Sequence, residues 1–181
     1  MNILDQFRYS RDDPSQLNIK LKQDPYEKVG TSKNQNINNL LSTSVKVSKE
    51  IFPGISVAID NVFNRLKIKN SFSFFVTANH LEVQATCSAM PLGDTAEIIL
   101  TSKLIEVLNI EELESIIAHE IAHFYYQHSL YPPISEAKTR IEKLNLLNFS
   151  RAAEISADRI GFIGSNDLEA SLRAMLKITS G

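Results

Sequence analysis

The sequence predicts an α+β domain in which a small, mainly antiparallel sheet is followed by a run of helices. β-branched and aromatic residues concentrate between residues 72 and 101, whereas helical periodicity dominates from residue 102 onward. With 181 residues, 43% of them hydrophobic, the chain can bury one ordinary core. We therefore expect one domain over residues 36–181, preceded by a polar arm over residues 1–35.

The polar arm has the composition of a loosely ordered segment. The alternative for residues 1–35 is a pro-segment or a lid over a cleft. Apolar residues at helical spacing predict an amphipathic helix over residues 37–52, which Pro53 and Gly54 close. A second, weaker segment over residues 55–68 can also be helical.

Three runs are typical of strands, at residues 72–77, 81–87 and 97–101. The first two are joined by the short segment 78–80, and together the three runs look like a small, mainly antiparallel sheet. The order in which the three strands pair is left open by the sequence.

The remaining chain reads as helices separated by proline, glycine and capping residues. The expected helices cover residues 102–108, about 110–129, 135–163 and 167–178. Pro132 and Pro133 end the second of these, a break is expected near Asn148 in the third, and Asp167 caps the last.

Charge and cysteine content exclude several classes of protein. A net charge of -2 gives no electrostatic basis for binding nucleic acid or an anionic membrane. The single cysteine, Cys87, excludes an intrachain disulfide framework and is expected to be a buried, inert thiol rather than a zinc ligand. No run of about 18 apolar residues could span a bilayer, and the first residues lack the apolar core of a secretory signal. These features predict a cytoplasmic protein.

The motif His119-Glu120-Ile121-Ala122-His123 lies inside a strongly helical segment. Its two histidines are four residues apart, so both imidazoles lie on one face of the helix and can share a tetrahedral metal ion. Glu120 points to the side of that face, where it can take a proton from a water molecule without binding the metal. A chance pattern on a surface helix is the alternative, but the neighbouring isoleucines indicate a helix packed in the core.

A catalytic zinc ion needs a third protein ligand. The metzincin arrangement is absent, because Tyr126 and Ser129 stand where its glycine and third histidine would be. His128 points away from the two motif histidines on a regular helix, so we expect it to be a helix-end or second-sphere residue.

The best remaining ligand is Glu154, with Asp158 one helical turn later on the same face. Asp158 can then accept the spare ring N–H of a ligating histidine. Small residues, Ala153 and Ala157, would let this helix approach the histidine helix closely. The alternative is an ordinary solvated pair of acids.

The paired motifs, His119-Glu120-Ile121-Ala122-His123 and Glu154-Ile155-Ser156-Ala157-Asp158, resemble peptidase family M48, whose members are gluzincins. The resemblance covers about residues 85–164 and implies a zincin-like fold with one Zn²⁺ per chain. It implies that His119, His123 and Glu154 bind zinc, that Glu120 is the general base and acid, and that Asp158 supports a ligand.

The resemblance also implies an extended peptide substrate that adds its backbone to the strand at residues 97–101, beside Ile98, Ile99 and Leu100. Many members of the family have transmembrane helices, which this sequence lacks. Gluzincins usually place a Tyr, His or Arg beyond the third ligand to stabilise the oxyanion, and only Arg159 and Arg173 are candidates for that role here.

We therefore predict a zinc-dependent endopeptidase that hydrolyses peptide bonds with metal-activated water. The alternatives are a catalytically weak or inactive zinc-binding regulatory or interaction module of the same fold, and a scaffold without metal. The sequence indicates neither the oligomeric state nor the preferred cleavage site.

Overall fold

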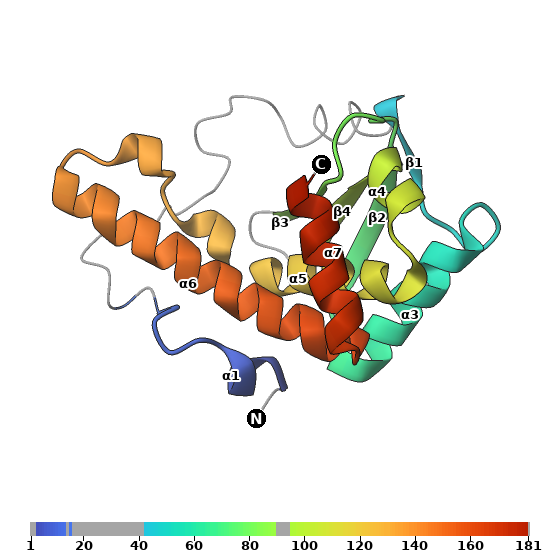
Figure 1. Cartoon of the computed structure of the whole chain (residues 1–181), viewed down its shortest axis with the longest axis horizontal. Helices are drawn as coiled ribbons and strands as arrows, with labels where there is room; N and C mark the ends of the chain where they lie inside the picture. Colours follow the sequence, from blue (N-terminus) through green and yellow to red (C-terminus); the bar gives the residue numbers. More distant parts are fainter. Residues whose placement is uncertain (1–2, 14, 16–41, 90–94, 181) are drawn as a thin grey trace.

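A computed structural model describes residues 3–13, 15, 42–89 and 95–180 (Figure 1). It is a mixed α+β fold in which helices outweigh a four-stranded sheet. The main elements are α1 (Ile3–Phe7), β1 (Ser44–Lys46), α3 (Pro53–Leu66), β2 (Ser71–Thr77), β3 (Ala85–Ala89), β4 (Thr95–Thr101), α4 (Ser102–Val107), α5 (Ile110–Tyr125), α6 (Arg140–Ser165) and α7 (Leu168–Ser180). Two short 3-10 helices, η2 (His128–Leu130) and η3 (Ile134–Glu136), lie between α5 and α6.

The sheet has the strand order β1-β2-β4-β3. Strand β2 runs parallel to β4, whereas β1 pairs with β2 and β3 pairs with β4 in antiparallel fashion. The sheet is therefore mixed, and β2 and β3 are not neighbours although they follow each other in the chain. As a consequence β4 is an interior strand, and β3 forms one edge of the described sheet.

The helix predicted over residues 37–52 is confirmed at residues 42 and 43 and is wrong from residue 44 onward. Residues Ser44–Lys46 form strand β1, in which Val45 pairs with Val76 of β2. A short alternation of valines with polar residues suits the edge of a sheet, and this local pattern prevails over the longer helical spacing. Residues 37–41 lie outside the described residues.

The later helices follow the sequence closely. Helices α3 and α4 confirm the segments predicted there, and Asp167 caps α7 by accepting a hydrogen bond from the backbone N–H of Ala170 (3.0 Å). Helix α6 is continuous over 26 residues, so the predicted break near Asn148 is wrong. The side chain of Asn148 is exposed, and an exposed asparagine weakens a helix without interrupting it.

Helix α5 is the centre of the hydrophobic core, because residues 112–118 are all buried. Helix α6 approaches it closely at two glycines. A Cβ atom added to Gly164 would lie 2.2 Å from the Cβ of Ala118, and one added to Gly161 would lie 2.9 Å from the carbonyl oxygen of Ser115. This close contact fixes the distance between the two helices that carry the paired motifs.

Residues 3–13 differ from the expected loosely ordered arm, because they pack against the domain. Leu4 is 1% exposed and belongs to the core, and Asp12 is fully buried. Residues 16–35 lie outside the described residues, so the division into an arm and a domain stays a prediction. Among the helices of the described ranges, none combines the length and the apolar character needed to cross a membrane.

Candidate metal centre

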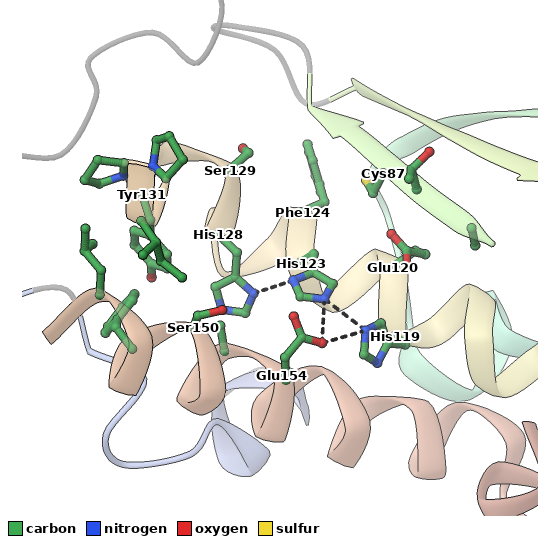
Figure 2. A pocket seen from close by; sticks show the side chains of 18 residues that line it. Cys87, His119, Glu120, His123, Phe124, His128, Ser129, Tyr131, Ser150 and Glu154 are labelled. Carbon is green, nitrogen blue, oxygen red and sulfur yellow. Dashed lines mark hydrogen bonds and ion pairs between the residues drawn. The ribbon is translucent and has the colours of Figure 1, made fainter. Parts of the chain in front are cut away.

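The histidine motif lies in the last two turns of α5. Asn109 begins this helix with a capping box, in which its side chain and that of Glu112 each accept a backbone N–H of the other residue. His119 and His123 face the same side, and their Nε2 atoms are 2.9 Å apart. The predicted spacing therefore brings the two imidazoles together, as Figure 2 shows.

Helix α6 brings Glu154 to the same point. Its Oε2 atom lies 3.4 Å from Nε2 of His119 and 3.7 Å from Nε2 of His123 (Figure 2). One turn later, Oδ1 of Asp158 lies 3.1 Å from Nδ1 of His119. The structure thus places all four predicted residues in the predicted relation, with one atom each from His119, His123 and Glu154 converging within 4.8 Å of one another.

These three groups fit a zinc ion. Two imidazoles and a carboxylate suit zinc, and tetrahedral bonds of about 2.0–2.1 Å separate ligand atoms by roughly 3.3 Å. The two distances to Glu154 are close to that spacing, and the distance between the histidine nitrogens is somewhat shorter. The site therefore needs only small side-chain adjustments to hold such an ion.

The electrostatics of the site favour a bound cation. Burial disfavours a charge on His119, but the hydrogen bonds that its ring donates to the carboxylates of Asp158 and Glu154 outweigh burial and raise the pKa of His119 to about 10. The two histidines in turn lower the pKa of Glu154. A metal ion can take the place of the proton that the carboxylates attract to this site.

The other ring nitrogen of His123 contacts His128, which has the second-sphere position expected as one alternative but does not point away from the motif histidines. Helix α5 ends at Tyr125, and Gln127 adopts a left-handed conformation with φ 57°, which turns the chain back toward the helix. Nδ1 of His128 therefore lies 2.8 Å from Nδ1 of His123. The expected helix to residue 129 was too long, and only its early end lets His128 reach the site.

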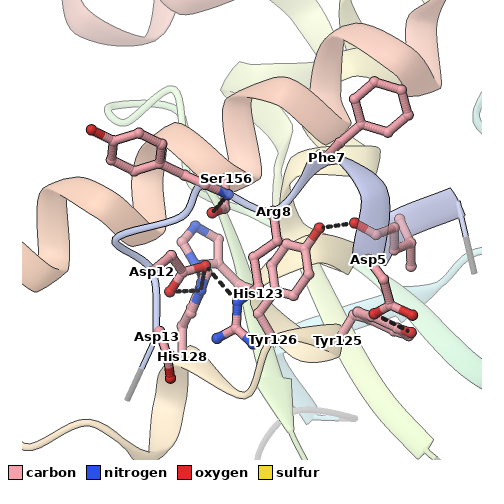
Figure 3. Close-up of polar contacts among 12 residues, drawn as sticks. Asp5, Phe7, Arg8, Asp12, Asp13, His123, Tyr125, Tyr126, His128 and Ser156 are labelled. Atoms are coloured by element: carbon pink, nitrogen blue, oxygen red, sulfur yellow. Dashed lines mark hydrogen bonds and ion pairs between the residues drawn. The ribbon is translucent and has the colours of Figure 1, made fainter. Parts of the chain in front are cut away.

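Asp12 completes this chain of contacts from the N-terminal segment. Its Oδ2 atom lies 3.0 Å from Nε2 of His128, as Figure 3 shows. Burial opposes the charge of Asp12, but hydrogen bonds from His128 and Ser156 prevail and lower its pKa, while burial lowers the pKa of His128. Sequence reasoning missed Asp12, because a single aspartate in a polar segment carries no signal of a tertiary contact.

Glu120 lies beside the metal ligands and near the edge strand. Its carboxylate accepts a hydrogen bond from the backbone of Cys87, and burial raises the pKa of Glu120. Burial and the nearby charge of Glu120 raise the pKa of Cys87 to about 12, so its thiol stays protonated. This state agrees with the expected inert thiol.

A cavity of about 620 Å³ opens next to these residues. Residues of strand β3, Ala85 to Cys87, line one part of it, and η2, η3 and α6 line another. Much of the lining is apolar and includes Phe124, Tyr131, Pro132, Pro133, Ile134, Leu146 and Phe149. The cavity can therefore admit an extended chain between the edge strand and the metal centre.

The predicted substrate strand, residues 97–101, needs correction. Strand β4 pairs with β2 on one side and with β3 on the other, so the backbones of Ile98, Ile99 and Leu100 have no free edge. The side chains of Ile98 and Leu100 are fully buried. The edge strand beside the cavity is instead β3, which sequence patterns could not reveal because the pairing order was open.

The two arginines predicted as oxyanion stabilisers lie away from the site. Arg159 donates to the carbonyl oxygen of Phe7 (3.5 Å) and stacks over the ring of Tyr9. Arg173 pairs with Glu112 at the opposite end of α5. The structure therefore shows other contacts for both guanidinium groups, and their role as oxyanion stabilisers stays a prediction.

Comparisons with known proteins agree with this geometry. Residues 57–141, which include the histidine motif, match the model of Peptidase family M48. The chain is 24% identical over 103 residues to plastoglobule-localized metallopeptidase 48, chloroplastic, of Arabidopsis thaliana. That match covers 49% of this chain and 30% of the relative's length. Glu154 and Asp158 lie outside the family match, so their assignment rests on the geometry of α6.

Proposed function

From the match of residues 57–141 to the model of Peptidase family M48, we propose that the chain is a zinc-dependent endopeptidase with a zincin-like fold. The observation that carries the proposal is the convergence of His119, His123 and Glu154 beside a cavity. Three protein ligands and an open side are typical of a catalytic zinc site, whereas structural sites are closed by a fourth protein ligand. The predicted cytoplasmic location stays a prediction.

A zinc ion at this site would act as a Lewis acid toward water and the scissile carbonyl. Nε2 of each histidine and Oε2 of Glu154 would hold it, because these are the atoms that converge. Asp158 accepts the Nδ1–H of His119, which fixes the tautomer that leaves Nε2 free to bind metal.

Glu120 is the proposed general base and acid. It follows His119 directly on α5, so it borders the metal site without joining the three ligands. Burial raises the pKa of Glu120 toward neutral pH. A group with such a pKa can both take a proton from water and return it to the leaving amine. Glu120 and Cys87 of the neighbouring strand both line the cavity.

The proposed substrate is an extended peptide that adds its backbone to the edge of β3 that pairs with no other described strand. Thr86 and Cys87 of this strand line the cavity together with Glu120. A peptide paired there would pass between β3 and the metal centre, and the apolar part of the cavity would take one of its apolar side chains.

The test compares cleavage of a peptide library by the wild-type protein, the Glu120→Gln variant and the Glu111→Gln variant. Glu111 is exposed on the first turn of the same helix, so its substitution is a matched control. We expect Glu120→Gln to keep one zinc ion per chain and to lose cleavage by at least about 100-fold, the lower end for general acid-base catalysis. Cleavage that persists in Glu120→Gln, or a wild-type protein that binds zinc and cleaves nothing, would contradict the proposal and leave a zinc-binding module.

A further inference from the structure

The N-terminal segment, residues 3–13, is built into the back of the metal centre. We propose that Asp12 is a positioning residue, which orients the metal ligand His123 through His128 and makes metal affinity depend on the docked segment. This inference rests on the proposed function, because it assumes that His123 binds metal. It assigns the N-terminal segment a supporting role, in contrast to the lid or pro-segment considered from the sequence.

The segment is anchored to both helices of the metal centre (Figure 3). The buried hydroxyl of Tyr126, at the end of α5, donates to the carbonyl oxygen of Leu4 (2.6 Å). The backbone N–H of Tyr9 donates to Oγ of Ser156 on α6 (2.9 Å). The guanidinium of Arg8 lies over the ring of Tyr126, 5.0 Å from its centroid. These contacts hold Asp12 at a fixed place behind the site.

The hydrogen bonds between Asp12, His128 and His123 have one consistent direction. If Nε2 of His123 binds metal, its Nδ1 carries the proton and donates to Nδ1 of His128. Nε2 of His128 then carries a proton and donates to the carboxylate of Asp12. Each histidine is neutral in this arrangement. The direction of the hydrogen bonds is fixed, because the ionised carboxylate of Asp12 can accept a hydrogen bond but cannot donate one.

The burial of Asp12 indicates a specific role for this carboxylate. It is fully buried, and an unpaired carboxylate in that position would be strongly destabilising. Arg8 donates to it from Nε (3.2 Å), and His128 donates from Nε2. The side chain of His128 is only 6% exposed, so its contact with Asp12 is shielded from water.

The arrangement on His123 parallels that on His119. Asp158 contacts Nδ1 of His119 directly, whereas Asp12 reaches Nδ1 of His123 through one intervening imidazole. Both metal-binding histidines therefore have a carboxylate behind them, one from α6 and one from the N-terminal segment. Such outer carboxylates fix ligand orientation and raise ligand basicity.

The experiment measures zinc affinity by competition with a chromophoric chelator for the wild type and the variants Asp12→Ala, Asp12→Asn and Asp5→Ala. Asp5 is the matched control, because it lies in the same segment and accepts from Tyr125 instead of His128. We expect Asp12→Ala to weaken zinc binding by about 10- to 100-fold. Asp12→Asn, which keeps an acceptor oxygen but loses the charge, should lose less, and Asp5→Ala should match the wild type.

Two further measurements separate positioning from simple loss of structure. The absorption spectrum of the Co²⁺-substituted protein reports ligand geometry, and we expect it to change in both Asp12 variants but not in Asp5→Ala. In a His128→Phe background, Asp12→Ala should cause no additional loss of zinc affinity, since the connection to His123 is already gone.

Each result decides between the proposals. Unchanged zinc affinity and an unchanged Co²⁺ spectrum in Asp12→Ala would overturn this inference and leave the proposed function intact. If Asp12→Ala does not fold, the same two readouts in Asp12→Asn decide, and values equal to the wild type would overturn it. An equal loss with and without His128 would overturn the route through His128. Absence of zinc binding in the wild type would overturn the proposed function, and this inference with it.

Discussion

The two ends of α5 hold buried or half-buried acids in opposite ways. At the start of the helix, Glu112 accepts from Lys177 (2.6 Å) and Arg173 (3.2 Å), and Glu114 pairs with Arg65. Both glutamates are almost fully buried, at 1% and 2% exposure. Cations of the protein itself therefore neutralise this end, and it has no place for another positive ion.

At the end of α5 the acids have only histidines as ion-pair partners within the described ranges. Glu154 faces His119 and His123, and Asp158 faces His119. The arginine nearest in sequence to Asp158, Arg159, is held by Phe7 and Tyr9 instead. The difference explains how one helix can carry both a structural ion-pair cluster and the proposed metal site, because only the second leaves its negative charge for an external cation.

The largest expected difference between the two ends is in metal binding after a ligand is removed. His119→Ala should weaken zinc binding on the order of 1000-fold, because one of few metal ligands is lost. Glu112→Gln, at the other end of the same helix, should leave zinc affinity unchanged. Chelator competition measures both, and a His119→Ala variant with wild-type affinity would contradict the ligand assignment.

Exchange of one acid at each end should separate stability from metal binding. Glu154→Gln should weaken zinc binding with little effect on the metal-free fold, because its side chain is 54% exposed. Glu114→Gln should keep zinc binding and lower the free energy of unfolding by about 2 kcal/mol, because Arg65 loses its ion pair and keeps only the carbonyl oxygen of Gly164 as an acceptor. Urea unfolding of the metal-free variants, combined with zinc titration, tests this crossed pattern. Loss of both properties in either variant would contradict it.

The close approach of α5 and α6 should be the next most sensitive feature. Gly164→Ala places a Cβ atom against that of Ala118 and should destabilise the protein by about 2 kcal/mol through overpacking. Gly54→Ala is the control, because a Cβ atom there meets no other atom within 4 Å. Thermal unfolding measures both, and equal stability of the two variants would show that α6 can move away from α5.

The smallest expected effect is the loss of unfolding free energy at acid pH from the ion pairs at the start of α5. Burial opposes the charge of Glu112, but Lys177 and Arg173 outweigh it and lower its pKa below the ordinary value of 4.5. Its stabilising contribution is therefore complete above pH 4.5 and is lost as the pH falls through the lowered pKa. The gap in unfolding free energy between wild type and Glu112→Gln should shrink in that acid range. A gap that widens there would reverse the assigned sign.

The sequence predicted the elements whose signals are local. The four-residue spacing of His119 and His123 on a helix, and of Glu154 and Asp158 on another, depends only on helical geometry, and the structure brings all four together. The strand order, the early end of α5 and the burial of Asp12 depend on contacts between distant segments. That is why the edge strand was assigned to Ile98–Leu100 and Asp12 was missed.

The most direct test of the account is the location of zinc in a crystal structure of the full chain, from its anomalous scattering. We expect one peak per chain, about 2.0–2.2 Å from Nε2 of His119, Nε2 of His123 and a carboxylate oxygen of Glu154. We expect no zinc peak at Glu112 or Glu114, because lysine and arginine side chains already pair with these carboxylates. A zinc peak at another set of ligands, or none in zinc-saturated crystals, would contradict the central claim.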